Sequence, residues 1–170
     1  AQINAGIEAT SFEVHGSAGQ GRWTAIPWVA VRDPRESASI NEGVYVVYLF
    51  EPQEQRVHLT LNQGVKRLKE EFGMGDARQR LREHAQTVRQ QLSPDGFTAG
   101  ELEFTHASNR NKLYGPGTIF YKTYTLDALP DPQTAEKDLQ TIVTAYENFV
   151  EGRSRSDDEN QSEAVEITPS

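Results

Sequence analysis

Two short segments contain residues whose types and spacing suit the binding of a flat ligand. The first is Gly19-Gln20-Gly21-Arg22, a flexible turn with a long polar side chain and a cation, and it leads to Trp28. The second, Gly43–Phe50, is rich in aromatic and β-branched residues and includes Leu49. A turn, an aromatic face and an arginine around one concavity suit a planar, partly apolar ligand such as a nucleobase. Taken singly, Trp28 and Leu49 are typical of core residues on strands.

The residue patterns of catalytic centres are missing. Cysteine is absent, which excludes disulfides, thiolate nucleophiles and cysteine-based zinc sites. The Gly-x-Gly turn lacks the third glycine and the following helix of a dinucleotide-binding motif, and no P-loop occurs. The four histidines lack metal-ligand spacing and are expected at the surface or in hydrogen bonds within the sheet: His15, His58, His84 and His106. We therefore predict a binding domain rather than an enzyme, with no metal and no cofactor.

Bulk composition is typical of a single polar domain. The 170 residues are long enough to bury one core, 36% of them are hydrophobic, and the mean hydropathy is -0.66. No apolar run approaches the roughly 20 residues that cross a bilayer, and no signal-peptide core opens the chain. We expect a soluble, cytoplasmic protein that does not enter membranes.

Charge is distributed unevenly along the chain. The formal net charge is -8, but residues 151–170 hold six acids against two arginines. Residues 104–126 hold three cations and no acid, and residues 66–91 hold seven cations against four acids. A modest local basic face is therefore possible, although the run at 66–91 is most simply a solvated helix face.

Periodicity and turn signals predict an α+β fold, a mostly antiparallel β-sheet flanked by two main helices. Strands are expected near residues 12–16, 26–31, 44–50, 57–61, 102–104 and 118–124, with the third and fourth forming a hairpin. Apolar spacing predicts a helix over 76–92 capped by Asp76, and a last helix that starts at Asp131-Pro132. We predict one domain over 1–150 and a disordered acidic tail over 151–170.

An ordered series of motifs identifies a family resemblance over about residues 12–150. The blocks are Gly-x-Gly-x-aromatic-x-x-Ile-Pro-Trp, Gly-Val-Tyr-x-Val-x-Leu-Phe, Leu-x-Leu-Asn-Gln-Gly-Val, a Lys-Leu-Tyr-Gly turn, and a closing helix with Asp138-Leu139 and Ala145-Tyr146-Glu147. This series resembles the N-terminal DNA-binding domains of the McrB family, the specificity subunits of modification-dependent restriction systems in phage defence.

The resemblance implies a domain that binds double-stranded DNA containing a modified cytosine, such as 5-methylcytosine, by base flipping. The base rotates out of the duplex into a pocket, and no chemistry is done there. A GTP-driven motor elsewhere in the parent protein and a separate nuclease subunit cut the DNA. Because the motor drives assembly in this family, the isolated domain is expected to be monomeric.

The same resemblance assigns residues to the pocket and to the DNA backbone. Trp28, Leu49 and Tyr114 keep the family's residue type in the pocket, whereas Gln20 stands where an aromatic ring stacks on the base. Trp23 is a possible substitute ring, and the modified base read here could differ from 5-methylcytosine. The candidates for phosphate contacts, which position the DNA without reading its sequence, are Arg22, Arg110, Lys112 and Lys122.

A second interpretation stays open. The net acidity and the Gln20 departure also suit a protein-interaction or regulatory module on the same scaffold, without base flipping. The sequence fixes neither the base modification and flanking sequence that are read nor the effector domain that follows.

Overall fold

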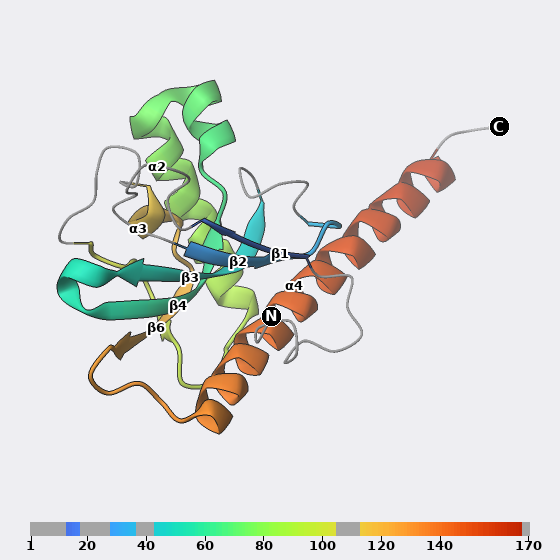
Figure 1. The fold of residues 1–170 in the computed structure, drawn as a ribbon. Coiled ribbons are helices and arrows are strands. Elements are labelled where there is room, and N and C mark those ends of the chain that lie inside the picture. The colour runs from blue at the N-terminus through green and yellow to red at the C-terminus, as the bar shows by residue number, and fades with distance from the viewer. Residues whose placement is uncertain (1–12, 18–27, 37–42, 105–112, 168–170) are drawn as a thin grey trace.

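The computed structural model describes residues 13–17, 28–36, 43–104 and 113–167, with side chains described for 29–36, 43–104 and 113–153. Within these residues a six-stranded antiparallel sheet has the order β1-β2-β3-β4-β6-β5 (Figure 1). The strands are β1 Glu13–Ser17, β2 Trp28–Arg32, β3 Val44–Glu51, β4 Arg56–Gln63, β5 Thr98–Ala99 and β6 Phe120–Thr125. The helices α2 (Lys66–Gln91) and α4 (Pro132–Ile167) complete the α+β fold, which confirms the predicted class.

The central hairpin β3–β4 is the best-defined feature that the sequence predicted. Val44 pairs with Gln63 at one end and Glu51 with Arg56 at the other. A 3-10 turn, Pro52–Glu54, and Gln55 in the left-handed region (φ +52°) reverse the chain. The β-branched and aromatic side chains of both strands fit a buried pleated surface.

One face of the sheet is covered by the two long helices. The side chain of Gln63 on β4 donates from Nε2 to the carbonyl of Leu81 on α2, at 3.0 Å. On β6, Lys122 Nζ lies 2.9 Å from the Asp138 carboxylate on α4. Lys122 pairs with Leu59 of β4, and Gln63 lies four residues after Leu59 on the same strand. Because side chains alternate along strands, Gln63 and Lys122 lie on one face. We call this the helix face.

Over the opposite face lie residues 101–104, which follow β5, and the short helix α3 (Tyr114–Gly117), which precedes β6. Phe104 packs its ring edge-on against His58 of β4, with centroids 5.6 Å apart. Asn62 of β4 donates from Nδ2 to the Tyr114 carbonyl at 3.4 Å. We call this the loop face.

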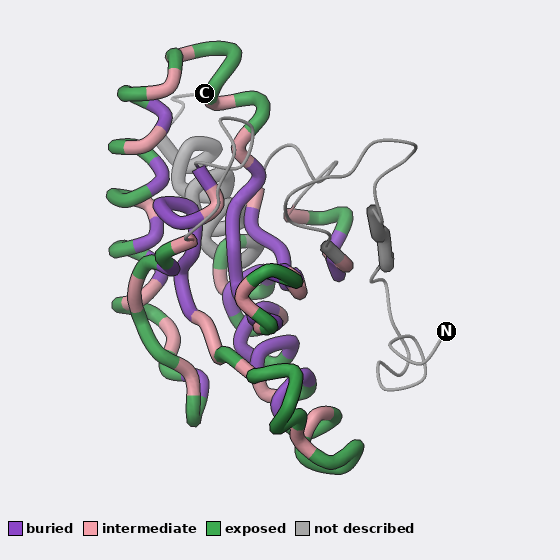
Figure 2. Tube along the Cα trace, turned by 60° about the vertical axis from the view of Figure 1, so that its left-hand side comes forward, coloured by how far each residue is buried: buried purple, intermediate pink, exposed green. Residues whose placement is uncertain are grey.

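The core lies between the sheet and the helices. Figure 2 shows buried chain running along the central strands, while α2 alternates between buried and exposed positions. Leu59, Leu61, Ile142 and Tyr146 have no exposed surface. No helix in the described part of the chain is long and apolar enough to cross a membrane.

Helix α2 begins ten residues before the predicted start. It runs from Lys66, and Gly73 (φ +79°, ψ 172°) divides it into two segments. The predicted cap at Asp76 was therefore wrong, because Asp76 lies inside the second segment. The first segment was missed because its half-buried apolar residues, Leu68 and Phe72, are sparse, and Gly73 and Gly75 separate them from the periodic pattern that follows. Glycine is needed at position 73, since this backbone region is almost closed to other residues.

Two further expectations at the end of the chain have different outcomes. Asp131 does cap α4, accepting at Oδ1 from the Thr134 N–H at 2.8 Å, with Pro132 at the first helical position. Beyond residue 150, however, α4 continues to Ile167 where a disordered tail was predicted. Glutamate, glutamine, alanine and arginine favour helix there, and no proline interrupts it. The division into a domain and a tail stays a prediction.

The predicted strand at 102–104 does not form. Strand β5 lies earlier, and Thr98 pairs with Tyr121 of β6. Leu102 and Phe104 pack instead on the core, Phe104 against His58, so their alternating pattern reflects packing on the loop face rather than strand pairing.

Candidate nucleic-acid interface

One register row crosses the sheet at the predicted base pocket. Trp28 is the register partner of Leu49, Leu49 of His58, and His58 of Thr123. Direct partners in an antiparallel sheet have Cβ atoms roughly 4.5–5.5 Å apart on one face. Two of the four predicted pocket positions, Trp28 and Leu49, are thus immediate neighbours in the row, which belongs to the loop face.

The third pocket residue, Tyr114, is placed over the same face by a Gly-Pro-Gly segment. A Cβ on Gly115 would lie 2.5 Å from the carbonyl oxygen of Leu102, and one on Gly117 would lie 2.8 Å from Asn62 Oδ1. Only glycine permits these approaches without a shift of the backbone. Tyr114 is half-buried and packs against the main core, and its carbonyl accepts from Thr118 Oγ1 at 2.6 Å.

His58, a member of the row, is the centre of a buried polar cluster. Its Nε2 is 2.5 Å from Glu51 Oε1, its Nδ1 is 2.8 Å from Thr123 Oγ1, and Arg56 binds the same Glu51 oxygen at 2.8 Å. Burial lowers the pKa of His58, and the hydrogen bond to Glu51 opposes part of that shift. His58 is a hydrogen-bonded structural residue of the sheet, as the sequence predicted.

Leu49 is part of the core as well as of the row. Its side chain has no exposed surface and belongs to the main hydrophobic cluster. A ligand could touch it only after neighbouring side chains move. The structure shows Leu49 as a core residue, and its role as a pocket wall stays a prediction.

Lys122 lies apart from these residues. It is on the helix face, where its ammonium group binds Asp138 Oδ1, and Tyr124 donates to Asp138 Oδ2 at 2.6 Å. The structure therefore does not bring Lys122 to the row of Trp28 and Leu49.

Four of the predicted site residues lie outside the described residues, namely Gln20, Arg22, Arg110 and Lys112. The residues that flank the first segment, Ser17 and Trp28, are register partners at the end of the β1–β2 pair. Phe104 and Leu113 flank the second, and Phe104 contacts His58 in the row. Both segments thus have an end anchored at the row.

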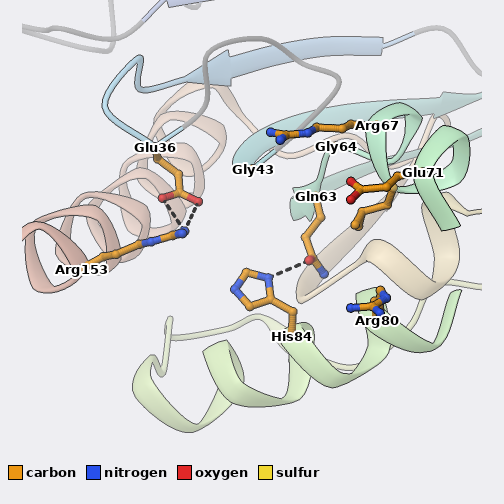
Figure 3. A pocket seen from close by; sticks show the side chains of 10 residues that line it. Glu36, Gly43, Gln63, Gly64, Arg67, Glu71, Arg80, His84 and Arg153 are labelled. Carbon is orange, nitrogen blue, oxygen red and sulfur yellow. Dashed lines mark hydrogen bonds and ion pairs between the residues drawn. The ribbon is translucent and has the colours of Figure 1, made fainter. Parts of the chain in front are cut away.

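A charged cavity of about 470 Å³ was not predicted from the sequence. Figure 3 shows it between the two segments of α2, the ends of β3 and β4, and α4. Its lining residues are Glu36, Gly43, Gln63, Gly64, Arg67, Leu68, Glu71, Arg80, His84 and Arg153. The available signal was the cation-rich run at 66–91, interrupted by Gly73 and Gly75, which was interpreted as a solvated face.

Groups that could hold a metal ion do not gather in the described part of the chain. No set of three or more histidine, aspartate or glutamate side chains is suitably placed there.

Comparison with known proteins identifies the family. The model of the "MrcB-like, N-terminal domain" family matches residues 2–151, so the chain belongs to this family, which fits a DNA-binding, non-catalytic role in modification-dependent restriction. No curated protein matches the chain.

Proposed function

We propose that this member of the MrcB-like N-terminal domain family recognises a modified base in double-stranded DNA, most simply a methylated cytosine, by holding the flipped base on the loop face. The pocket would be formed by Trp28, Leu49, Tyr114 and Gln20. The parent protein would carry or recruit the GTP-driven motor and the nuclease that act on the bound DNA.

The observation that carries the proposal is the register row. Trp28 and Leu49 are far apart in the sequence, yet β2 and β3 pair them directly. Tyr114 adjoins the same face, where its carbonyl accepts a hydrogen bond from Asn62, and Gln20 lies outside the described residues. Residues assigned by resemblance alone would not be expected to converge in this way unless they shared a site.

The energetics are consistent with flipping. Extruding a base costs a few kcal/mol of stacking and pairing. Stacking on an aromatic side chain returns roughly 1–3 kcal/mol per base, and burying one methyl group adds about 0.8 kcal/mol. Because a methyl group contributes so little, discrimination must depend on pocket shape and on rejection of wrong exocyclic groups.

The phosphate contacts would come from Arg22, Arg110 and Lys112, which lie outside the described residues. Lys122 is the fourth cation of the predicted set, and its ammonium group already binds Asp138. We expect its contribution to DNA affinity to be the smallest of the four.

The experiment is fluorescence anisotropy of wild type and Trp28→Ala with duplexes that carry cytosine or 5-methylcytosine in one context. Trp28→Ala should abolish the preference for modified DNA and leave weak binding to both duplexes. An equal loss on modified and plain DNA would show that Trp28 does not hold a flipped base.

Salt dependence separates this proposal from a protein-interaction module. Binding through several phosphates weakens steeply with salt, because each contact releases counterions. A domain that binds all duplexes weakly, with little salt dependence, would instead favour the interaction module suggested by its net charge of -8.

A further inference from the structure

The charged cavity beside α2 lies on the helix side of the sheet and contains no residue of the proposed base pocket. The bend at Gly73 creates it, since Arg67 and Glu71 precede the bend and Arg80 and His84 follow it. Figure 3 shows these side chains on one side of the cavity, with Glu36 and Arg153 on the other. Five separate segments of the chain thus converge on one space.

Hydrogen bonds fix the tautomer of His84 at the base of the cavity. Gln63 Nε2 donates to the carbonyls of Leu81 at 3.0 Å and Gly117 at 3.3 Å, so its Oε1 must face His84. His84 Nδ1 lies 2.8 Å from that oxygen and must donate to it. The neutral ring therefore presents Nε2 as an acceptor, and Figure 3 shows Nε2 pointing toward the side of Arg153.

The charged groups around His84 come from every neighbouring element. Three arginines and two glutamates line the cavity, a local excess of positive charge in a chain of net charge -8. Arg153 binds both oxygens of Glu36, at 2.8 and 2.9 Å. The guanidinium carbon of Arg80 lies 3.8 Å from the Phe72 ring centroid, a contact that fixes its position at the rim.

Burial, and secondarily the charge of Arg153, lowers the pKa of His84. The ring is consequently neutral at neutral pH when the cavity holds no anion. An anion oxygen can form a hydrogen bond with Nε2 only if one of the two atoms carries a proton.

We propose that this cavity binds a phosphomonoester, with Arg80 contacting the phosphate oxygens and His84 Nε2 sharing the phosphate's last proton. The second pKa of a phosphomonoester is about 6 and the pKa of His84 is lowered, so the phosphate can keep its last proton and donate it to Nε2. A phosphodiester or a sulfate ion has no such proton near neutral pH. The cavity thereby discriminates a terminal phosphate from a DNA backbone phosphate.

The test uses the whole chain and four small probes: inorganic phosphate, methyl phosphate, dimethyl phosphate and sulfate. Binding is followed by the NMR signals of the His84 ring and of the amides around Gln63 at pH 7. Phosphate and methyl phosphate should shift these signals, whereas dimethyl phosphate and sulfate should have affinities lower by roughly tenfold or more.

Arg80→Gln should weaken methyl phosphate binding by roughly tenfold or more, because it removes a charge-assisted hydrogen bond. Arg78→Gln is the matched control, since Arg78 is on the same helix and does not line the cavity. His84→Gln should remove the difference between methyl phosphate and sulfate. Equal binding of sulfate and methyl phosphate to wild type, or equal binding by Arg80→Gln and Arg78→Gln, would overturn the proposal.

Two duplexes identify the source of the phosphate. If the ligand is a terminal phosphate on DNA, a 5′-phosphorylated duplex should shift the His84 signals and a 5′-hydroxyl duplex should not. A small-molecule ligand predicts no difference between them. Base recognition is unaffected by either result, since Arg80→Gln should keep any preference for modified cytosine.

Discussion

The two faces of the sheet differ in how they are covered and in what they bury. On the helix face, aliphatic residues such as Leu59 and Leu61 meet α2 and α4, and polar groups such as Lys122 and Asp138 tie helix to strand. On the loop face, Leu49 lies in a row with His58 and Thr123, and residues 101–104, which form no helix or strand, pack there through Phe104. Long helices stabilise a fold, whereas irregular segments move more readily. We therefore expect stability to depend mainly on the helix face and the proposed recognition on the loop face.

The sharpest test replaces one leucine on each face, since neither Leu49 nor Leu59 has any exposed surface. Leu49→Ala and Leu59→Ala should each lower the free energy of unfolding by about 2–5 kcal/mol, as measured by urea denaturation. Only Leu49→Ala should also reduce the preference for a modified base. A similar loss of preference in folded Leu59→Ala would remove the functional difference between the faces.

Gly73→Ala tests the bend on the helix side. A Cβ at position 73 would meet nothing within 4 Å, so the expected loss of about 1–3 kcal/mol comes only from the backbone conformation. Gly75→Ala is the control, because Gly75 also has open space and no positive φ. It should be stabilising by roughly 0.5–1 kcal/mol. Equal effects of the two substitutions would contradict the bend.

His58→Gln tests the polar cluster of the loop face. The substitution removes the imidazole ring that hydrogen-bonds to Glu51 and Thr123, which are then left without this buried partner. It should lower the free energy of unfolding by about 1–3 kcal/mol at pH 7.5.

The pH dependence gives the matching control. Burial lowers the pKa of His58 and of His84, so the unfolded chain binds more protons below about pH 6.5. The stability that the two neutral histidines contribute is complete above the histidine pKa of the unfolded chain, and it is lost as pH falls through the lower pKa of the folded state. Wild type should therefore lose stability in that range, and His58→Gln should lose less. Parallel curves of unfolding free energy against pH for the two proteins would contradict the assignment of this pH dependence to His58.

Lys122→Gln should have the smallest effect. Loss of the pair with Asp138, which is partly exposed, should cost less than about 1 kcal/mol and leave DNA affinity nearly unchanged. A direct phosphate contact would instead weaken binding to all duplexes and reduce the salt slope by about one.

The elements with strong local signals could be predicted from the sequence. The β3–β4 hairpin follows from its β-branched and aromatic residues, and the start of α4 from Asp131-Pro132. The first segment of α2 could not be predicted, because its helix depends on packing of Leu68 and on a bend at Gly73. The helix propensity of the local sequence reflects neither this packing nor the bend.

The candidate site was predictable only in part. Motifs suggested Trp28 and Leu49, but their adjacency depends on strand register, which links residues 21 positions apart. The charged cavity is harder still to predict, since Glu36, His84 and Arg153 come from three distant segments.

The most direct test of recognition on the loop face is the affinity of wild type for matched duplexes at about 100 mM salt. The duplexes would carry cytosine, 5-methylcytosine, 5-hydroxymethylcytosine, N4-methylcytosine or N6-methyladenine in one context, with binding measured by fluorescence anisotropy. A clear preference for one modified cytosine is the predicted result. Equal, weak binding to all five would contradict recognition of a modified base.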